Sequence, residues 1–329
     1  MPYRAVIIGA GAIGSRLDAP EGSACGTRLT HAGGYRAHPA FTLEAIADAD
    51  ETSGRMESAR WGTPFFGDPA RMLADVQPDV VSICAPTAKH EELAALAIKS
   101  SARAIVCEKP LGPDLASSRR IASMAEAWGG VFLVNYTRRF VPFYASLARR
   151  IRDGEELVQN VTVKYAKGVS HNGSHALDLS RFLFGEPLEV LALGRTSDFW
   201  EADPTVSAFM RFERCPQFFL QGQDERAFTF FEYDIVTREA RYQVNEDGFT
   251  LNRYGIRHSP HYRCDSLGIS GREDTGHGQA ILNLLDHLRE LLEANGRDAP
   301  PPRCGVRDAL RAQEIAHELA TQTPTGGRA

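Results

Sequence analysis

The most informative segment for the fold is Gly9-Ala10-Gly11-Ala12-Ile13-Gly14, which directly follows the apolar, strand-like run Ala5–Ile8. Glycines at this spacing form the turn that carries a dinucleotide pyrophosphate between a first strand and a helix. Gly9 would allow the tight turn, Gly11 the close approach of phosphate to the backbone, and Gly14 the close packing of helix on strand. The alternative interpretation is a glycine-rich turn that binds no ligand. The preceding strand favours the nucleotide-binding turn over this alternative. The motif therefore predicts a nucleotide site formed by Gly9, Gly11, Ala12, Ile13 and Gly14.

Strand and helix patterns alternate through the rest of the N-terminal part. Near-continuous apolar strands separated by helices are typical of a parallel sheet covered on both faces. We therefore expect a doubly wound Rossmann domain over residues 1–135. Its further strands are expected at Leu43–Ala47, Val80–Cys84, Ala104–Cys107 and Val131–Val134, with helices at Glu91–Ser100 and Leu115–Trp128.

The second half has a different pattern, because strand-like segments follow one another directly. Several alternate polar and apolar residues, which is typical of an antiparallel sheet with one wet face. Residues 136–329 are thus predicted to form an α+β domain with an open, mostly antiparallel sheet. The strands are expected at Val158–Tyr165, Glu189–Leu193, Val206–Phe212, Gln217–Gln221, Ala227–Tyr233 and Arg241–Asn245, and the helices at Ser174–Phe184, Gln279–Ala294 and Asp308–Thr321. The proline-rich Ala299–Cys304 is expected to be a stiff connector and the tail Thr323–Ala329 to be frayed.

Composition supports two globular domains and excludes several classes of protein. The 329 residues are 43% hydrophobic and 24% charged, and 37 basic against 42 acidic residues leave a net charge of −5, so neither disorder nor a nucleic-acid partner is expected. The six cysteines form no C-x-x-C pair, which favours reduced thiols over disulfides or zinc. We find no signal-peptide pattern and no apolar run that could span a bilayer. These features predict a soluble, cytoplasmic protein.

An acidic residue after the second strand points to the choice of cofactor. Asp48 follows that strand, but 34 residues after Gly14, where about 20 are usual. The surplus is Ser15–Thr30, which we interpret as an insertion that breaks or delays the first helix. Asp48 would accept hydrogen bonds from the ribose hydroxyls and repel a 2′-phosphate, so NAD is predicted over NADP. Arg55 is the one nearby cation that could still meet such a phosphate.

A charged pair, Glu108-Lys109, follows the fifth strand and precedes Pro110. Ligands bind at the carboxyl ends of strands in open α/β sheets, so Lys109 is a candidate for substrate binding and catalysis rather than a surface lysine. Pro110 biases Lys109 to an extended backbone and would hold it in place. The same edge adds cofactor-binding candidates, namely Ala85, Pro86, His90 and Glu108.

The third signal is the segment His171-Asn172-Gly173-Ser174-His175, followed by Asp178. Asn172 or Ser174 can cap a helix on which His175 and Asp178 lie one turn apart. The positive end of the helix dipole favours a neutral imidazole at His175, which suits a proton acceptor. A metal site of His171, His175 and Asp178 is disfavoured, because Gly173 weakens the helix and Asn172 stands where a zincin has its glutamate. A core or capping role is more credible for His171 than for His175.

The order G-x-G-x-x-G, A-P-T-x-x-H at 85–90, E-K-P at 108–110 and G-x-H-x-x-D-x-x-R-F at 173–182 resembles the Gfo/Idh/MocA oxidoreductases. The resemblance implies hydride transfer between a nicotinamide cofactor and a hydroxyl-bearing carbon of a sugar or cyclitol. It also implies a homodimer or homotetramer formed through the second domain's sheet. By position, Lys109 and His175 match the catalytic residues, with the base left open between them. Asn135, Tyr136 and Arg139 match a segment that borders the substrate.

One position departs from the family, since many members have an aspartate where this chain has His171. This difference argues against inositol-dehydrogenase-like chemistry. The insertion, with Thr30–Tyr35 after it, and the segment 171–175 are similar to members from surface-polysaccharide pathways. This resemblance implies oxidation of a UDP-sugar, UDP-N-acetylglucosamine at C3, for lipid A amino-sugar synthesis. Lys164, Lys167, Arg138 and Arg139 could meet a diphosphate or be solvated charges. The alternatives are a free sugar or cyclitol substrate and a regulator without turnover, which would not need Lys109 and His175.

Overall fold

The computed structural model describes residues 1–21, 26–294 and 300–324. Cys25, part of the insertion, Ala299 and the end of the tail lie outside the described residues. Contacts divide the chain into two units, Met1–Phe140 with Gly278–Arg311, and Val141–His277 with Ala312–Ala329. These units differ from a single boundary between residues 135 and 136, because a late segment returns to the first unit. Helix α8 (Ala280–Glu293) packs there against α1, where a Cβ on Gly34 would lie 3.0 Å from the Ile281 side chain.

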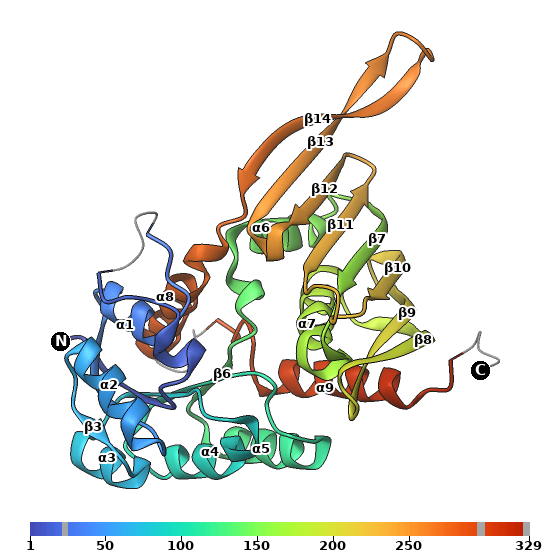
Figure 1. Ribbon diagram of the computed structural model, residues 1–329. Coiled ribbons are helices and arrows are strands. Elements are labelled where there is room, and N and C mark those ends of the chain that lie inside the picture. The colour runs from blue at the N-terminus through green and yellow to red at the C-terminus, as the bar shows by residue number, and fades with distance from the viewer. Residues whose placement is uncertain (22–25, 295–299, 325–329) are drawn as a thin grey trace. The chain divides into compact units, whose positions relative to one another are not determined.

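The N-terminal unit contains the predicted parallel sheet. Its order is β3-β2-β1-β4-β5-β6, with every neighbouring pair parallel (Figure 1). Its central strands are fully buried, as expected for a sheet covered on both faces. The strands are β1 (Tyr3–Ile8), β2 (Phe41–Ala47), β3 (Phe65–Phe66), β4 (Val80–Ile83), β5 (Ala104–Cys107) and β6 (Val131–Val134). This sheet confirms the doubly wound fold.

Helices connect these strands, and most begin with a polar capping residue. The Asp114 carboxylate accepts from Ser117 N–H at the start of α5, whose bounds agree with the prediction. Asp50 and Asp68 cap α2 and α3 in the same way. The helices of this part are α1 (His31–Ala37), α2 (Glu51–Trp61), α3 (Pro69–Val76), α4 (His90–Ile98) and α5 (Leu115–Trp128).

The insertion delays the first helix, as predicted. A short helical turn, Ala12–Arg16, begins within the glycine motif, and the first α-helix among the described residues begins at His31. Within the insertion, Asp18 is buried and folds back onto the start of α1. Its carboxylate accepts from Thr30 N–H at 2.7 Å, Thr30 Oγ1 at 2.8 Å and Leu29 N–H at 2.9 Å. Thr30 in turn caps α1 by accepting from Gly33 N–H. The insertion therefore fixes the residue that opens α1.

The C-terminal unit contains an eight-stranded sheet in the order β14-β13-β12-β11-β7-β10-β9-β8. Its pairs are antiparallel except β7 with β10, which confirms the mostly antiparallel sheet. The strands are β7 (Val158–Tyr165), β8 (Pro187–Trp200), β9 (Asp203–Phe212), β10 (Cys215–Gly222), β11 (Phe231–Thr237), β12 (Ala240–Asn245), β13 (Thr250–Ser259) and β14 (Cys264–Asp274). Helices α6 (Pro142–Arg152) and α7 (Gly173–Phe184) pack together in this unit, and α9 (Val306–Thr321) ends there.

The strand predictions for this unit differ from the structure in one strand and one hairpin. The segment Ala227–Tyr233 was placed too early, since β11 begins at Phe231 and the preceding Phe228 is an exposed residue outside any strand. The hairpin of β13 and β14 was not predicted, because its outer part is exposed on both faces and lacks the alternation of a half-buried strand (Figure 1). Among the described residues, no helix is both long and apolar enough to cross a membrane.

Candidate active site

The glycine motif has the geometry that its spacing predicts. Gly9 has a φ of +106°, and a Cβ there would lie 2.6 Å from the backbone of Cys84 and Ala85. A Cβ on Gly14 would lie 2.1 Å from the Gly9 carbonyl oxygen. In contrast, a Cβ on Gly11 would meet only the Arg16 side chain, at 4.0 Å. The open space over Gly11 is what a pyrophosphate would need in order to approach the backbone.

Asp48 lies at the carboxyl end of β2, beside this turn. Its Oδ2 accepts from Ala10 N–H at 2.6 Å and its Oδ1 from Asp50 N–H at 2.8 Å. Each carboxylate oxygen can accept a further hydrogen bond. Arg55 is turned to the helix surface, where its guanidinium donates to Glu51 at 2.6 Å and lies over the Phe65 ring. Asp48 is thus held in place, and the cation that could have met a 2′-phosphate is paired.

A cavity of about 230 Å³ opens beside Asp48 at the carboxyl edge of the sheet. Its walls are mainly apolar with a few polar groups, which is typical of small-molecule sites. Its position beside Gly9 and Asp48 fits the adenosine half of a dinucleotide. The lining residues are Ile8, Gly9, Ala47, Asp48, Ala49, Gly67, Pro69, Ala85, Pro86, Lys89, Glu92 and Leu93. Gly9, Asp48, Ala85 and Pro86 are brought together here. Ala12, Ile13, His90 and Glu108 are not part of the lining.

His90 is buried at the start of α4. Its Nε2 lies 2.9 Å from the Ala85 carbonyl oxygen, and its Nδ1 lies 3.0 Å from the Pro110 carbonyl oxygen. It therefore ties the loop after β4 to the loop after β5. These contacts favour an indirect role, in which His90 shapes two loops that face the cofactor.

Glu108 belongs to a network of hydrogen bonds that the sequence patterns did not predict. His31 Nε2 lies 3.0 Å from Glu108 Oε1, and the same oxygen accepts from Asn135 Nδ2 at 2.7 Å. On its other side, His31 Nδ1 lies 2.8 Å from Ser82 Oγ, which lies 2.7 Å from the Tyr35 hydroxyl. The network, hereafter the His31 network, consists of Tyr35, Ser82, His31, Glu108 and Asn135. It joins α1 to the ends of β4, β5 and β6.

The surroundings of Glu108 favour its charged form. Burial raises the pKa of this carboxyl, but the hydrogen bond and charge of His31, the Asn135 amide and the Lys109 charge together hold its pKa below the ordinary value of 4.5. Burial also raises the pKa of the Tyr35 hydroxyl and, together with the Glu108 charge, that of the Cys84 and Cys107 thiols. Glu108 is therefore an anion that His31, Asn135 and Lys109 stabilise.

Lys109 follows Glu108 directly, and its backbone N–H donates to Glu108 Oε2 at 3.3 Å. Its position at the carboxyl end of β5 agrees with the prediction. Tyr136 is buried, and Arg139 is committed to the Arg303 carbonyl at 2.7 Å and to Asp308 at 3.2 Å. These contacts favour a packing role for Arg139 within the N-terminal unit.

In the C-terminal unit, α7 places His175 in its first turn with Asp178 one turn later, as predicted. The capping residues were predicted wrongly. Asn172 Nδ2 donates to the Ala166 carbonyl and Ser174 Oγ to the His171 carbonyl, so neither side chain caps the helix. The His175 ring meets Phe231 edge to face at 6.4 Å, and Asp178 is buried. Residues 1–21, 26–294 and 300–324 contain no cluster of three or more potential metal ligands.

The loop before α7 is tied to the β8–β9 hairpin. Asp203 accepts from Ser170 N–H at 2.8 Å and His171 N–H at 2.9 Å. His171 lies edge to face with Trp200 at 4.8 Å. The Lys167 ammonium lies 4.2 Å from the Phe199 ring centre, whereas Lys164 is exposed on β7. His171 thus stands between His175 and an exposed aromatic hairpin tip.

Comparison with known proteins connects these features to a family. Residues 3–136 match the model of an oxidoreductase family with an NAD-binding Rossmann fold, GFO_IDH_MocA. This part of the N-terminal unit is therefore similar to the Rossmann domain of that family. This match agrees with the glycine motif and the parallel sheet, and it identifies the domain as NAD-binding.

Individual proteins that are similar to this chain are distant in sequence. Inositol 2-dehydrogenase 1 of Saccharopolyspora erythraea is 28% identical over 158 residues, covering 47% of this chain and 42% of that protein. D-glucoside 3-dehydrogenase of Escherichia coli K12 is 25% identical over 207 residues, covering 56% and 55%. The chain thus spans about half the length of the curated relatives it matches. A solved UDP-N-acetylglucosamine 3-dehydrogenase of Acidithiobacillus ferrooxidans superposes with a TM-score of 0.70 at 19% identity, covering 97% of each chain, which shows a shared fold.

Proposed function

We propose that the protein is an NAD-dependent dehydrogenase that oxidises a secondary hydroxyl of a sugar or cyclitol. The observation that carries this proposal is the carboxyl edge of the parallel sheet. It combines open space over Gly11, a cavity beside Asp48 that could hold a nucleotide, and Glu108, whose side chain is 12% exposed, next to Lys109. A protein that only binds a dinucleotide needs the first two features but has no use for the third.

A free sugar, glycoside or cyclitol is the substrate class with the better support. Two of the relatives named above act on inositol and on glucosides. The second candidate substrate is UDP-N-acetylglucosamine, which would give the protein a role in surface amino-sugar synthesis. It rests on the segment His171–His175, on the insertion and on Lys164 and Lys167, which could meet a diphosphate. Of these, Lys167 already lies over Phe199.

The proposed roles follow from chemistry at named atoms. When bound, NAD supplies the acceptor for the hydride of the carbinol carbon. Gly9, Gly11 and Gly14 would hold the pyrophosphate, with Ala12, Ile13, Ala85, Pro86 and Glu108 along the cofactor, and Asp48 would accept from the ribose hydroxyls. Lys109 Nζ or His175 would take the hydroxyl proton, and the other group would orient the hydroxyl. Asn135, Tyr136, His171 and Asp178 are the remaining substrate-side candidates.

The decisive experiment measures NADH formation by the purified full chain with a panel of alcohols. The panel contains myo-inositol, scyllo-inositol, glucose, a methyl glucoside and UDP-N-acetylglucosamine, the last coupled to a glutamate-dependent aminotransferase that removes the keto product. Turnover on a polyol or glycoside supports the first substrate class, and turnover on the nucleotide alone supports the second. Tight NAD binding with no turnover on any alcohol would favour a regulator and reject the dehydrogenase.

The same preparation tests the choice of cofactor. We expect NAD(H) to bind more than about tenfold tighter than NADP(H), because Asp48 faces the position of the added phosphate and Arg55 is paired with Glu51. Calorimetry with both cofactors measures the ratio, and Asp48→Ala should reduce it. Equal affinities in the wild type would remove Asp48 from the ribose site.

We further infer a cytoplasmic homodimer or homotetramer formed through the C-terminal sheet. Apolar side chains such as Leu193, Phe219 and Ile269 are exposed on its strands. Such side chains are often covered by a partner. Light scattering during gel filtration measures the state, and a monomer at micromolar concentration would exclude this assembly.

A further inference from the structure

We propose that Arg16 binds the pyrophosphate of the dinucleotide and supplies the positive charge that a full first helix would otherwise bring to the glycine motif. The assignment rests on the cofactor site proposed above and is independent of which alcohol is oxidised. It concerns binding rather than turnover, so cofactor affinities measure it directly. It also gives a consequence to the early break in the first helix.

The helix that ordinarily follows a glycine motif is shortened here. In a dinucleotide-binding fold the pyrophosphate sits at the start of this helix, where aligned peptide dipoles and free N–H groups attract an anion. The turn Ala12–Arg16 contains five residues, which is little more than one helical turn, so few dipoles align behind Gly11. Less positive potential therefore reaches the glycine motif than a full helix would supply.

The next helix, α1, does not replace the missing charge. It begins at His31, and its start already has an anionic partner, because the Asp18 carboxylate accepts from Thr30 N–H at 2.7 Å. A Cβ on Gly33, in the first turn of α1, would lie 2.2 Å from Asp18 Oδ2. This carboxylate would repel a phosphate at the same place. The charge at the glycine motif is therefore left to a side chain.

The Arg16 side chain lies over the glycine motif. Its Nη2 is 4.0 Å from the position that a Cβ on Gly11 would occupy. The guanidinium is held there by its Nε, which donates to the Ala10 carbonyl at 3.1 Å. The N–H groups on Nη1 and Nη2 form no further hydrogen bond with the described residues, so they can donate to phosphate oxygens. A planar guanidinium can bind two such oxygens at once.

The other cations of α2 and of the cavity beside Asp48 are already paired. Each has a carboxylate partner that offsets its charge, and the pairs are Arg55–Glu51 at 2.6 Å, Arg60–Glu57 at 3.2 Å and Lys89–Glu92 at 2.9 Å. Arg60 also donates to the Asp18 carbonyl. Arg16, in contrast, has no carboxylate of the described residues within ion-pair distance, so its charge is available to a ligand.

Ala10 connects Arg16 to the proposed ribose contact. Its N–H donates to Asp48 Oδ2 at 2.6 Å, and its carbonyl accepts from Arg16 Nε at 3.1 Å. In a dinucleotide, the pyrophosphate is attached to the same ribose whose hydroxyls Asp48 would accept from. One residue thus fixes both an acceptor for the ribose and a donor for the pyrophosphate.

The test compares ligands with and without a pyrophosphate, by calorimetry on the full chain. We expect Arg16→Gln to weaken the binding of NAD and ADP-ribose about tenfold, because a charge-assisted contact is lost from an exposed guanidinium. Adenosine has no phosphate, so its affinity should be unchanged. Arg16→Lys should recover part of the loss, since it keeps the charge but not the planar fork. Added NaCl should weaken ADP-ribose binding to the wild type more than to Arg16→Gln.

Arg55→Gln is the matched control. It removes the same charge from the neighbouring helix α2, but Arg55 is paired with Glu51, so ADP-ribose should bind as it does to the wild type. Equal losses for ADP-ribose and adenosine in Arg16→Gln would overturn the proposal, because they would indicate a distorted turn. An unchanged ADP-ribose affinity would also overturn it. So would a loss for NADP alone, which would assign Arg16 to the 2′-phosphate.

The outcomes separate this assignment from the proposed reaction. A wild type that binds neither NAD nor ADP-ribose would overturn both the role of Arg16 and the cofactor site. Tight NAD binding without turnover on any alcohol would reject the dehydrogenase alone, and the affinities of the Arg16 variants would still decide its role. Arg16 is exposed, so its variants should fold, and thermal unfolding checks this.

Discussion

Two histidine–carboxylate pairs lie at the two ends of helix α1 in the N-terminal unit. The two histidines are similar, but their carboxylate partners differ in solvent exposure. His31 opens the helix and His38 follows its last residue. Both rings are buried, and their Nε2–oxygen distances are 3.0 and 3.2 Å. The Glu108 side chain is only 12% exposed, however, whereas that of Asp286 is 55% exposed. A paired histidine should therefore affect the charge of a carboxylate more strongly when that carboxylate is shielded from water.

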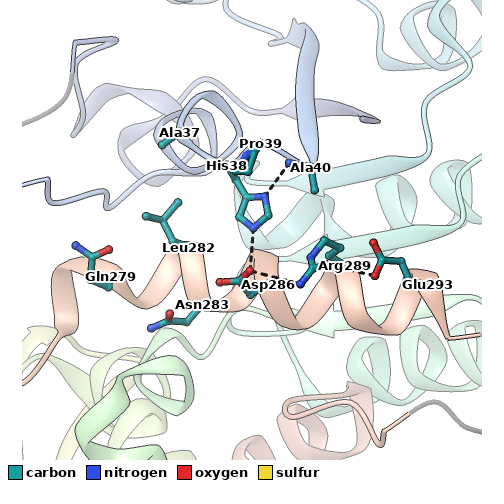
Figure 2. A pocket seen from close by; sticks show the side chains of 10 residues that line it. All are labelled: Ala37, His38, Pro39, Ala40, Gln279, Leu282, Asn283, Asp286, Arg289 and Glu293. Atoms are coloured by element: carbon teal, nitrogen blue, oxygen red, sulfur yellow. Dashed lines mark hydrogen bonds and ion pairs between the residues drawn. The ribbon is translucent and has the colours of Figure 1, made fainter. Parts of the chain in front are cut away.

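The His38–Asp286 pair links α1 to α8 at the protein surface. His38 Nδ1 accepts from Ala40 N–H at 3.2 Å, and the pair faces a groove of about 640 Å³ (Figure 2). Asp286 also lies 4.0 Å from Arg289, which pairs with Glu293 at 3.3 Å. Water can solvate these exposed charges, so each contact contributes little. The pair fastens the end of α1 to α8 and carries no proposed chemistry.

The largest expected effect is on kcat, and it tests whether the His31–Glu108 pair acts through Lys109. Lys109→Ala should lower kcat by about two to four orders of magnitude with NAD binding nearly intact, as for the loss of a proton-transfer group. If the pair acts through Lys109, adding His31→Leu to this variant should cost little more, because Lys109 is already gone. Steady-state kinetics of the single and double variants measure the coupling. Full additivity of the two losses would separate His31 from Lys109.

The second effect is on stability. His31→Leu should lower the free energy of unfolding by about 1–3 kcal/mol, because it leaves a buried carboxylate with one donor fewer. His38→Leu should cost about 1 kcal/mol or less, since water replaces the lost partner of Asp286. Urea unfolding of both variants at neutral pH gives the difference. Equal losses would show that solvent access does not distinguish the pairs.

The third effect is the pH dependence of that stability. Because the folded pKa of Glu108 is lowered, its contribution is present above the ordinary value of 4.5 and is lost as pH falls through the folded pKa. The stability gap between wild type and Glu108→Gln should therefore shrink as pH falls below about 4.5. Urea midpoints at a series of acidic pH values test this, and a gap that widened on acidification would contradict the sign.

The smallest effect concerns the insertion. Asp18→Asn keeps the shape of the side chain and weakens its hydrogen bonds to the start of α1, so we expect a loss of about 1 kcal/mol or less. Asp286→Asn at the other end of the helix should cost less, because the Asp286 side chain is 55% exposed. Urea unfolding measures both losses, and a larger loss in the Asp286 variant would reverse the roles of the two pairs.

Local sequence patterns predicted the parts of the fold that depend on neighbouring residues. Apolar runs such as Ala104–Cys107 and the helix Leu115–Trp128 were found with their bounds, since periodicity reports burial directly. The hairpin β13–β14 was missed because its outer residues face water on both sides. The predicted caps of α7 were wrong because Asn172 and Ser174 donate to carbonyl groups and do not accept from the helix N–H groups.

The glycine turn, the cofactor-binding sheet and the candidate pair Glu108-Lys109 could be predicted from the sequence alone, because each is a short-range property of the chain. Only the tertiary structure decided what surrounds Glu108. His31 lies 77 residues before it and Asn135 lies 27 residues after it, and neither belongs to a local motif with it. They meet because parallel strands end at one edge of the sheet and the insertion sets the start of α1 against that edge. A buried polar group must find its partners wherever the fold places them, and no local pattern records that choice.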